Sequence, residues 1–445
     1  MRRSICIPTA LASIFLVGVL AGCTGPTGPE GATGPEGPGG EAGPPGATGP
    51  EGTAGEAGPP GLPGLGTDAG AIVTSCLTPC HGFNGVVAQY QTSQHYVTYV
   101  TELGSETAAE WTTPGAACGN CHAIDALQNR VTGNVLTEGD AGVANLGGGE
   151  LQYLDSVTNK PNYANYTGTA TVAQVYCTTC HAVTPQNDPH VTGINWTPGS
   201  FPLVVSPDAG SIFVEKSPTA GAVTGTDAGF FGPGDTCMFC HRSRVDITNY
   251  ISPAGNTITS VYWGPHEGPQ ADLFTGVGGY HYAGMAYSQS THEQKLVCID
   301  CHMVPVAANS NVPDHSFNPQ IAACRNCHAG ITTFNVNGFQ TQMQAELTQI
   351  ETYLNGLGML TRATTAPYSP LAATELGDGN WFQDEPVPGS SLDGGLLTQD
   401  QAGALYNYIL VARGSAYGVH NPAYVGQILF DSATALGLTP QYPRP

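Results

Sequence analysis

Units of two cysteines followed directly by a histidine occur six times in this chain of 445 residues, and they constrain its fold more than any other feature. Twelve of the 14 cysteines belong to them, all except Cys6 and Cys23. Cys-x-x-Cys-His is typical of covalent haem attachment, because the thiols add to the two vinyl groups and the histidine binds the iron as proximal ligand. The units, called sites 1 to 6 in chain order, are Cys76/Cys80/His81, Cys118/Cys121/His122, Cys177/Cys180/His181, Cys237/Cys240/His241, Cys298/Cys301/His302 and Cys324/Cys327/His328.

Site 1 departs from this spacing, because three residues separate Cys76 from Cys80. The extra residue must bulge for both thiols to reach their vinyl groups. We still expect haem there, since His81 follows directly and no cysteine is left over for a disulfide. Zinc sites or disulfides are the alternatives for the other five sites. A histidine after every second cysteine favours haem, so we predict six covalently bound haem c groups, each holding iron.

Seven histidines remain once six of the 13 are assigned as proximal ligands. They are His95, His190, His266, His281, His292, His315 and His420. Seven candidates for six irons predict that every iron carries a second imidazole. Methionine is an alternative axial ligand, but we rank Met238, Met285 and Met303 behind the imidazoles. Six-coordinate iron suits electron transfer better than substrate binding.

The first 22 residues predict a secretion signal, with Arg2 and Arg3 before a short apolar run. The end of this segment, Leu20-Ala21-Gly22-Cys23, resembles the lipobox of bacterial lipoproteins, which implies lipidation of Cys23. Thr24 after that cysteine favours the outer membrane by the sorting rule. An ordinary signal peptide with a chance cysteine is the alternative. We therefore expect an outer membrane lipoprotein at the cell surface, anchored by acyl chains alone.

Glycine recurs at every third position from Gly25 to Gly64, a pattern that resembles collagen. Residues 23–66 are therefore predicted to form a stalk in polyproline II conformation, reaching roughly 120 Å. A triple helix, which would make the protein a homotrimer, and an extended single chain are equally compatible with the repeat. Either form is a spacer between the membrane and the rest of the chain.

Residues 67–445 are predicted to form one hexahaem cytochrome c domain, mostly irregular with α-helices and with the haems as its core. Three helices are expected after site 6. Thr398 and Gln401 resemble a capping box, which predicts that the second helix begins there. Asn421 followed by Pro422 resembles a helix start and predicts the third. The first helix is predicted from an apolar stripe, which consists of Met343, Leu347, Ile350, Leu354 and Leu357. Residues 361–395, rich in proline, are expected to be a long surface loop.

The formal net charge is −22, or −24 once Arg2 and Arg3 leave with the signal, since 10 basic then face 34 acidic residues. Such a surface repels nucleic acid and anionic membranes. It favours basic patches on other cytochromes or metal ions as partners, although plain solubility outside the cell explains the charge equally well.

A family resemblance covers roughly residues 236–436. Pro265-His266-Glu267-Gly268-Pro269-Gln270, Ser290-Thr291-His292, Asp314-His315, sites 5 and 6 and Gly418-Val419-His420-Asn421-Pro422 resemble the surface multihaem cytochromes of metal-reducing bacteria. Those are similar to pentahaem nitrite reductase and octahaem hydroxylamine oxidoreductase. The resemblance implies that His281 matches a catalytic histidine of the reductase, and we take it as the spare. The other six histidines would be distal ligands.

The departures from the reductase concern its substrate site. No unit here ends in lysine, which is the proximal ligand of the reductase's substrate haem, and Arg242 stands where a catalytic tyrosine is expected. We therefore predict extracellular electron transfer, to or from minerals, electrodes or other cytochromes including an outer-membrane conduit. The alternative is an enzyme that reduces or oxidises small nitrogen compounds. A stalked adhesive scaffold is a weaker hypothesis, and assembly into a filament is left open.

Overall fold

The computed structural model describes residues 85–96, 119–131, 152–154, 161–163, 175–188, 202–205, 211–214, 221–224, 232–243, 247, 250–261, 263–305, 313–362, 384–389 and 396–445. The chain divides into two units, Met1–Asp68 and Ala69–Pro445, and all described residues belong to the second. The predicted signal peptide, the predicted lipidation site Cys23 and the collagen-like repeat thus lie outside the described residues. So do Cys76, Cys80 and His81 of site 1, Cys118 of site 2, and His190.

Short helices carry the cysteine–histidine units. They are α5 (Gly119–His122), α7 (Cys177–Cys180), α8 (Asp235–Met238), α11 (Cys298–His302) and α12 (Ile321–Cys324). The four-residue step from the first cysteine to the histidine is one helical turn, so both lie on one side of the helix. The backbone closes this turn at sites 3, 4 and 6. There the histidine N–H donates to the carbonyl of the first cysteine, at 2.8, 2.9 and 2.8 Å respectively.

Other short elements connect these units. The helices are α2 (Val86–Gln91), α6 (Ala126–Val131), α9 (Gln270–Thr275) and α10 (Thr291–Lys295), with 3₁₀ turns η3 (Gly232–Gly234) and η5 (Val336–Gly338). The strands form three antiparallel pairs, β1 (Gln152–Leu154) with β2 (Pro161–Tyr163), β3 (Ser211–Val214) with β4 (Gly221–Thr224), and β5 (Leu360–Arg362) with β6 (Asp384–Pro386). The β5–β6 pair corrects the prediction for residues 361–395, because backbone hydrogen bonding joins the two ends of that loop.

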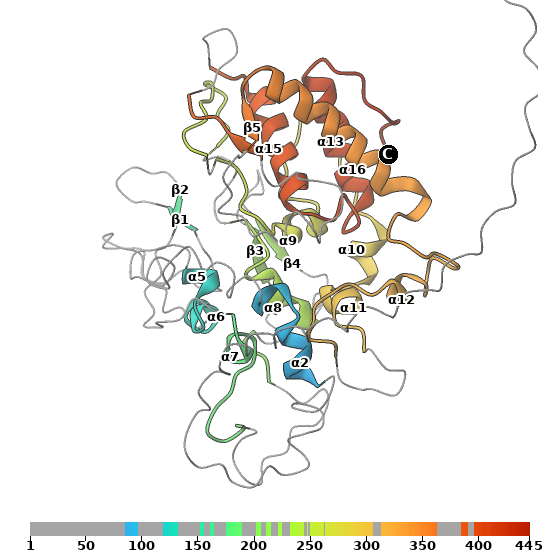
Figure 1. Cartoon of the computed structure of the whole chain (residues 1–445). Helices are drawn as coiled ribbons and strands as arrows, with labels where there is room; N and C mark the ends of the chain where they lie inside the picture. Colours follow the sequence, from blue (N-terminus) through green and yellow to red (C-terminus); the bar gives the residue numbers. More distant parts are fainter. Residues whose placement is uncertain are drawn as a thin grey trace, which may run out of the picture. The chain divides into compact units, whose positions relative to one another are not determined.

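Three longer helices follow site 6 and pack side by side (Figure 1): α13 (Phe339–Gly356), α15 (Gln399–Arg413) and α16 (Pro422–Ala435). All three sequence predictions for them are confirmed. The stripe on α13 is buried from Met343 to Leu354, and Leu357 packs against it. Thr398 and Gln401 form the capping box of α15, and the Asn421 side chain caps α16 with proline at its first position.

These helices build a hydrophobic core from their own side chains, in addition to the haem core that the sequence predicts for the domain. Its largest fully buried side chains include Tyr406, Tyr408 and Tyr424. Buried aromatic rings supply much of the apolar area that aliphatic residues do not. The haem core stays a prediction, and the C-terminal helices add a core made of their own side chains. A second, smaller cluster lies at site 4, where Met238 and Phe239 pack with residues of α6 and α9.

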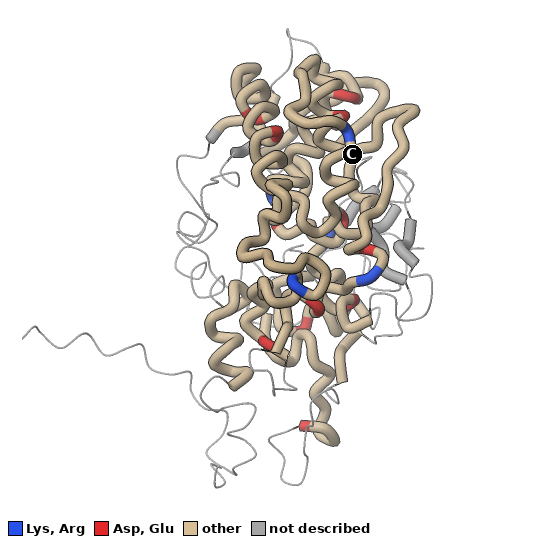
Figure 2. Tube along the Cα trace, turned by 90° about the vertical axis from the view of Figure 1, so that its right-hand side faces the viewer, with Lys and Arg blue, Asp and Glu red and all other residues tan. Residues whose placement is uncertain are grey.

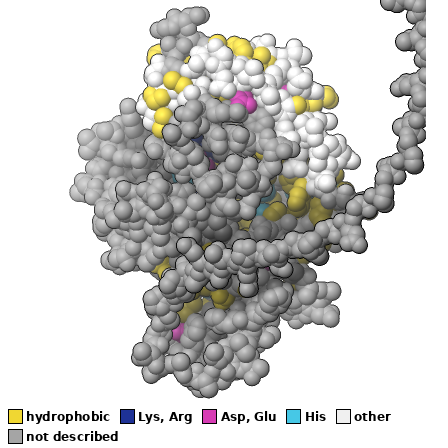
Figure 3. All heavy atoms as spheres, viewed as in Figure 1, with side chains coloured by type: hydrophobic (Ala, Val, Ile, Leu, Met, Phe, Trp, Pro, Cys, Tyr) yellow, Lys and Arg dark blue, Asp and Glu magenta, His cyan; other side chains and the backbone are white. Residues whose placement is uncertain are grey.

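Large apolar side chains that are exposed on the described surface are isolated from one another. Tyr176, Met285 and Leu396 are the exposed ones, and Figure 3 shows scattered hydrophobic side chains over the part that is coloured. Isolated exposed residues of this kind are normal for a folded surface. In the described part of the chain, no helix has both the length and the apolar character required to span a bilayer.

Candidate haem centres

Five of the six cysteine–histidine units place their histidine opposite a second imidazole. Ring centres are 5.8 Å apart for His95 and His241, 6.4 Å for His122 and His266, 6.3 Å for His181 and His315, 6.0 Å for His292 and His328, and 6.2 Å for His302 and His420. An imidazole nitrogen binds a metal at about 2 Å and lies roughly 1 Å from its ring centre. Two imidazoles on opposite sides of one iron thus have ring centres about 6 Å apart.

Each pair joins one proximal histidine to one of the predicted distal histidines. Sequence separation is large in four of the pairs, so the pairing comes from the tertiary fold. His315 illustrates this, because it lies between sites 5 and 6 in the sequence but faces His181 of site 3. The rings cross at 21° to 85°, so the pairs do not share one ring orientation. His81 and His190, the remaining members of the predicted set, lie outside the described residues.

The predicted attachment cysteines are described at nine of their twelve positions, and these nine form no disulfide among themselves. Cys121 of site 2 is half-buried in α5, directly before His122. Cys240 of site 4 is also half-buried, and its N–H donates to the Cys237 carbonyl at 3.1 Å. The distances between paired imidazoles bear on axial ligation of a metal and give no information on the thiols. Thioether attachment therefore stays a prediction at all nine: Cys121, Cys177, Cys180, Cys237, Cys240, Cys298, Cys301, Cys324 and Cys327.

Hydrogen bonds hold Nδ1 of five of the paired imidazoles and leave Nε2 for a metal. Backbone carbonyls accept from four of them at 2.7 to 2.9 Å: Glu267 O from His266, Val419 O from His292, Phe317 O from His302 and Pro313 O from His315. The fifth, His241, is 2.9 Å from the side-chain oxygen of Gln270. An acceptor at Nδ1 fixes the tautomer and the ring orientation, as is usual for metal-binding histidines.

Burial keeps several of these rings in the neutral form that binds metals. It lowers the pKa of His95 to about 3 and the pKa of His420 to about 3, and the neighbouring histidines add to both shifts. The pKa values of His181, His241 and His315 are also lowered, chiefly by burial. A neutral imidazole has the free lone pair that iron requires.

Contacts between the sites run in chain order from site 2 to site 6. Thr179 of site 3 donates to the Ile124 carbonyl just after site 2, at 3.0 Å. Val204, in the cluster around Met238 of site 4, donates its N–H to the Cys180 carbonyl of site 3 at 2.8 Å. Sites 2, 3 and 4 are therefore neighbours.

Site 5 then lies between sites 4 and 6. The first cysteines of sites 4 and 5, Cys237 and Cys298, are within hydrogen-bonding contact of each other. Their thiol sulfurs stand for the thioether sulfurs that haem attachment would leave. The Cys301 carbonyl of site 5 accepts the N–H of Gln320, which caps α12 of site 6, at 3.0 Å.

Phe317 links three sites through one residue, which the sequence did not indicate. Its ring centre is 4.9 Å from that of His95 of site 4 and 5.8 Å from that of His315 of site 3, while its carbonyl holds His302 of site 5. It has φ of +57°, uncommon for a residue with a side chain. This backbone turn brings the ring and the carbonyl to different haem sites.

The loop that leads into α16 organises sites 5 and 6 together. His420 belongs to site 5, and the preceding carbonyl, that of Val419, accepts from His292 of site 6. The Asn421 side chain is fully buried and makes four hydrogen bonds. It donates to the Phe274 carbonyl and to Gln289 Oε1, and it accepts from the N–H groups of Ser290 and Tyr424, at 2.7 to 3.3 Å.

His281, the predicted spare, is not paired with any of the five proximal histidines that the structure describes. Its Nε2 is 2.9 Å from the Tyr424 hydroxyl, and its ring stacks on Tyr287 with centres 4.2 Å apart. The Tyr424 hydroxyl accepts the N–H of Gly279 and so is free to donate to His281. Burial lowers the pKa of His281 to about 4, so the ring is a neutral acceptor near pH 7. His281 therefore contributes to packing on α16.

The methionines that were considered as ligands do not replace an imidazole in these pairs. Met238 is buried in the cluster at site 4, and Met285 is half exposed. Within the described residues, no three or more His, Cys, Asp or Glu side chains converge in a way that could hold a bare metal ion.

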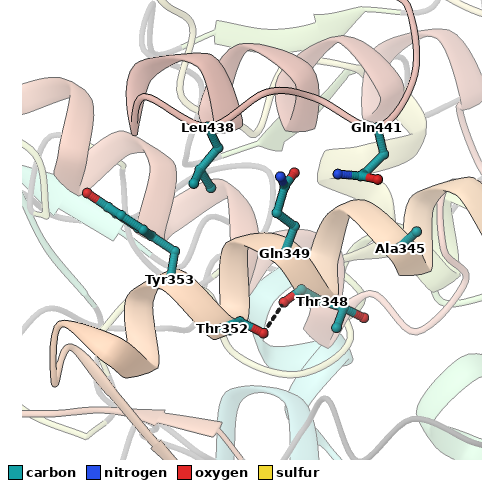
Figure 4. A pocket seen from close by; sticks show the side chains of 7 residues that line it. All are labelled: Ala345, Thr348, Gln349, Thr352, Tyr353, Leu438 and Gln441. Carbon is teal, nitrogen blue, oxygen red and sulfur yellow. Dashed lines mark hydrogen bonds between the residues drawn. The ribbon is translucent and has the colours of Figure 1, made fainter.

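A surface hollow of about 450 Å³ lies between α13 and the C-terminal segment (Figure 4). Amide, hydroxyl and aliphatic side chains line it, with Tyr353 and Leu438 at one end. Gln349 spans it and donates to the Thr439 carbonyl at 3.0 Å. The lining holds no histidine, cysteine or carboxylate, so the hollow shares no residue type with the candidate haem centres. A comparison of the chain with protein-family models and with curated proteins finds no match.

Proposed function

We propose that this protein is a six-haem c-type cytochrome that carries electrons at the outer cell surface. One observation carries the proposal: each of the five described proximal histidines faces a second imidazole with ring centres about 6 Å away, the separation across one hexacoordinate iron. The same residues fit the group chemically, since each described proximal histidine directly follows a pair of cysteines with the sequence spacing that is typical of haem attachment. The group, when bound, supplies one-electron redox chemistry.

The contacts between neighbouring sites support transfer from one haem to the next. Sites 2 to 6 touch in chain order, and the sulfurs of sites 4 and 5 are in contact. Close spacing of low-spin centres favours electron tunnelling, and axial ligands, burial and nearby charge set each potential. The expected lipid anchor and collagen-like stalk support a function outside the cell, with minerals, electrodes or other cytochromes as partners.

The spin state of the iron tests the proposal. Electron paramagnetic resonance of the oxidised full-length holoprotein is expected to show low-spin haem only, because every iron has two imidazoles. Mass spectrometry is expected to give six haems, and a mass for five would remove site 1. A substantial high-spin signal that changes on adding nitrite or hydroxylamine would replace the proposal with the enzyme alternative. That alternative would need an iron with one open position.

A further inference from the structure

The acceptor that holds the proximal histidine of site 4 is a side chain, whereas the other four acceptors described above are backbone carbonyls. Nδ1 of His241 is 2.9 Å from Oε1 of Gln270. A backbone carbonyl is present whichever residue occupies its position, but a side-chain acceptor disappears when that residue is replaced. Among the five imidazoles with a described acceptor at Nδ1, His241 is thus the one whose acceptor depends on the identity of a single residue.

The end of α15 orients the amide of Gln270. Its Nε2 donates to the carbonyl of Gly414, the C-terminal cap of that helix, at 3.3 Å. A carbonyl only accepts, so the NH₂ group faces Gly414 and the amide oxygen faces His241. His241 then donates from Nδ1 to this oxygen, which leaves the lone pair of Nε2 for a metal.

The loop before Gln270 is fixed on the same end of α15. The N–H of Gly268 donates to the Arg413 carbonyl at 3.2 Å. The Arg413 guanidinium donates to the Pro265 carbonyl and is 3.3 Å from the Glu267 carboxylate. Basic residues are few along the described trace (Figure 2), and this one is only 5 % exposed. A buried charge is costly unless it is paired, so these partners tie the loop to the helix end.

The backbone holds His241 independently of Gln270. The N–H of Ala271 donates to the His241 carbonyl at 2.8 Å. The loop also packs on the ring, because a Cβ at Gly268 would lie 3.4 Å from Nδ1 of His241. A substitution at Gln270 therefore removes the acceptor and leaves the contacts that place the histidine.

We propose that Gln270 is a positioning residue that lowers the reduction potential of site 4 through His241. The proposal rests on the electron-transfer function proposed above. An acceptor at Nδ1 makes the imidazole a more basic ligand, and a more basic axial ligand stabilises ferric iron more than ferrous iron. Site 4 lies in the middle of the contact series from site 2 to site 6, so its potential affects every electron that passes along the series.

Reduction potentials of the full-length holoprotein test this role. Gln270→Met removes the acceptor and keeps a side chain of similar length. A potentiometric titration followed by electron paramagnetic resonance gives a midpoint potential for each low-spin signal, and site 4 is the signal that His95→Ala removes. We expect Gln270→Met to lower the ferric-to-ferrous ratio of site 4 roughly tenfold at a fixed potential, a rise of about 59 mV in its midpoint potential.

Two variants serve as controls. Gln270→Glu keeps an oxygen that can accept from His241, so the potential of site 4 should stay at or below the wild-type value. Gln427→Met removes another buried amide, which accepts the N–H of Ser288 at 2.8 Å and donates to the Pro445 carbonyl at 3.0 Å. Neither partner is a predicted ligand, and we expect this variant to leave the potential of site 4 unchanged.

The possible outcomes separate the proposal from the function on which it rests. An unchanged potential of site 4 in Gln270→Met, the same rise at every haem, or an equal rise in Gln427→Met overturns the role of Gln270. An equal rise in Gln270→Glu overturns the hydrogen bond as its cause. High-spin iron in the resting wild-type protein is read before any variant is made, and it would instead overturn the proposed electron-transfer function.

Discussion

Replacing Asn421 with alanine is predicted to disturb two haem centres at once. The side chain makes four buried hydrogen bonds, and it directly follows His420 in the loop whose carbonyl at Val419 holds His292. Each lost bond costs about 1 kcal/mol, and buried groups left without partners add to this, so we expect a loss of about 2–4 kcal/mol in the free energy of unfolding. The loop then ceases to fix the imidazole planes of sites 5 and 6.

A matched control separates this effect from general destabilisation. Asn407 is also fully buried, and its side chain bonds both backbone groups of Tyr280 and the Ser432 hydroxyl, but none of these touches a predicted haem ligand. Asn407→Ala is expected to lose a similar amount of stability. Only Asn421→Ala should alter low-spin electron paramagnetic resonance signals and shift reduction potentials.

Denaturant unfolding, followed by far-ultraviolet circular dichroism, measures the stability of both variants, and spectroelectrochemistry measures the potentials. Spectra of Asn421→Ala that superimpose on wild type, at a stability loss equal to that of Asn407→Ala, would refute the role of this loop in orienting the ligands. A loss below about 0.5 kcal/mol would refute the hydrogen-bond estimate as well.

Three further predictions concern a buried carboxyl group, two histidines and the collagen-like repeat. Glu346 is fully buried and burial raises its pKa, so folding favours its protonated form; its stabilising contribution is complete below the unfolded pKa of about 4.3 and is lost as pH rises through the folded pKa. Glu346→Gln should therefore raise the melting temperature at pH 8 and leave it unchanged near pH 4, and the reverse order in thermal scans would contradict this. His315→Ala should convert one low-spin centre, that of site 3, to high spin, whereas His281→Phe should leave all centres low spin; a high-spin signal in the second variant would make His281 a ligand. Trimming residues 25–64 should convert a trimer to a monomer if the repeat forms a triple helix, as measured by sedimentation, and unchanged mass would discard the trimer.

Local patterns predicted the C-terminal helices well because short-range physics decides them. The stripe from Met343 to Leu354 and the cap at Thr398 depend on residues three or four apart. The ligand pairs depend on contacts between distant segments, so the histidines could be selected by counting but not matched to each other. His315 shows this limit, since its neighbours in sequence gave no hint of His181.

Side chains without a metal-binding motif could not be predicted from the sequence for a related reason. Phe317 acts through a carbonyl and an unusual φ, and Asn421 appeared only as a helix cap, although it holds two other segments. The side chains that form the core around Tyr406 and Tyr424 could not be predicted from a stripe, because every residue of α15 from Ala402 to Arg413 is buried. Aliphatic periodicity underestimates cores that are built from aromatic rings.

The long separation between paired histidines has a consequence for how the protein is made. A chain that is exported from its N-terminus presents His122 and His181 well before His266 and His315, their partners in space. Haem attached early at these sites would hold iron with a single imidazole until the later segment arrives. Under the proposed function, maturation would pass through intermediates in which the iron has one imidazole, and a chain truncated before residue 266 would stay in that condition.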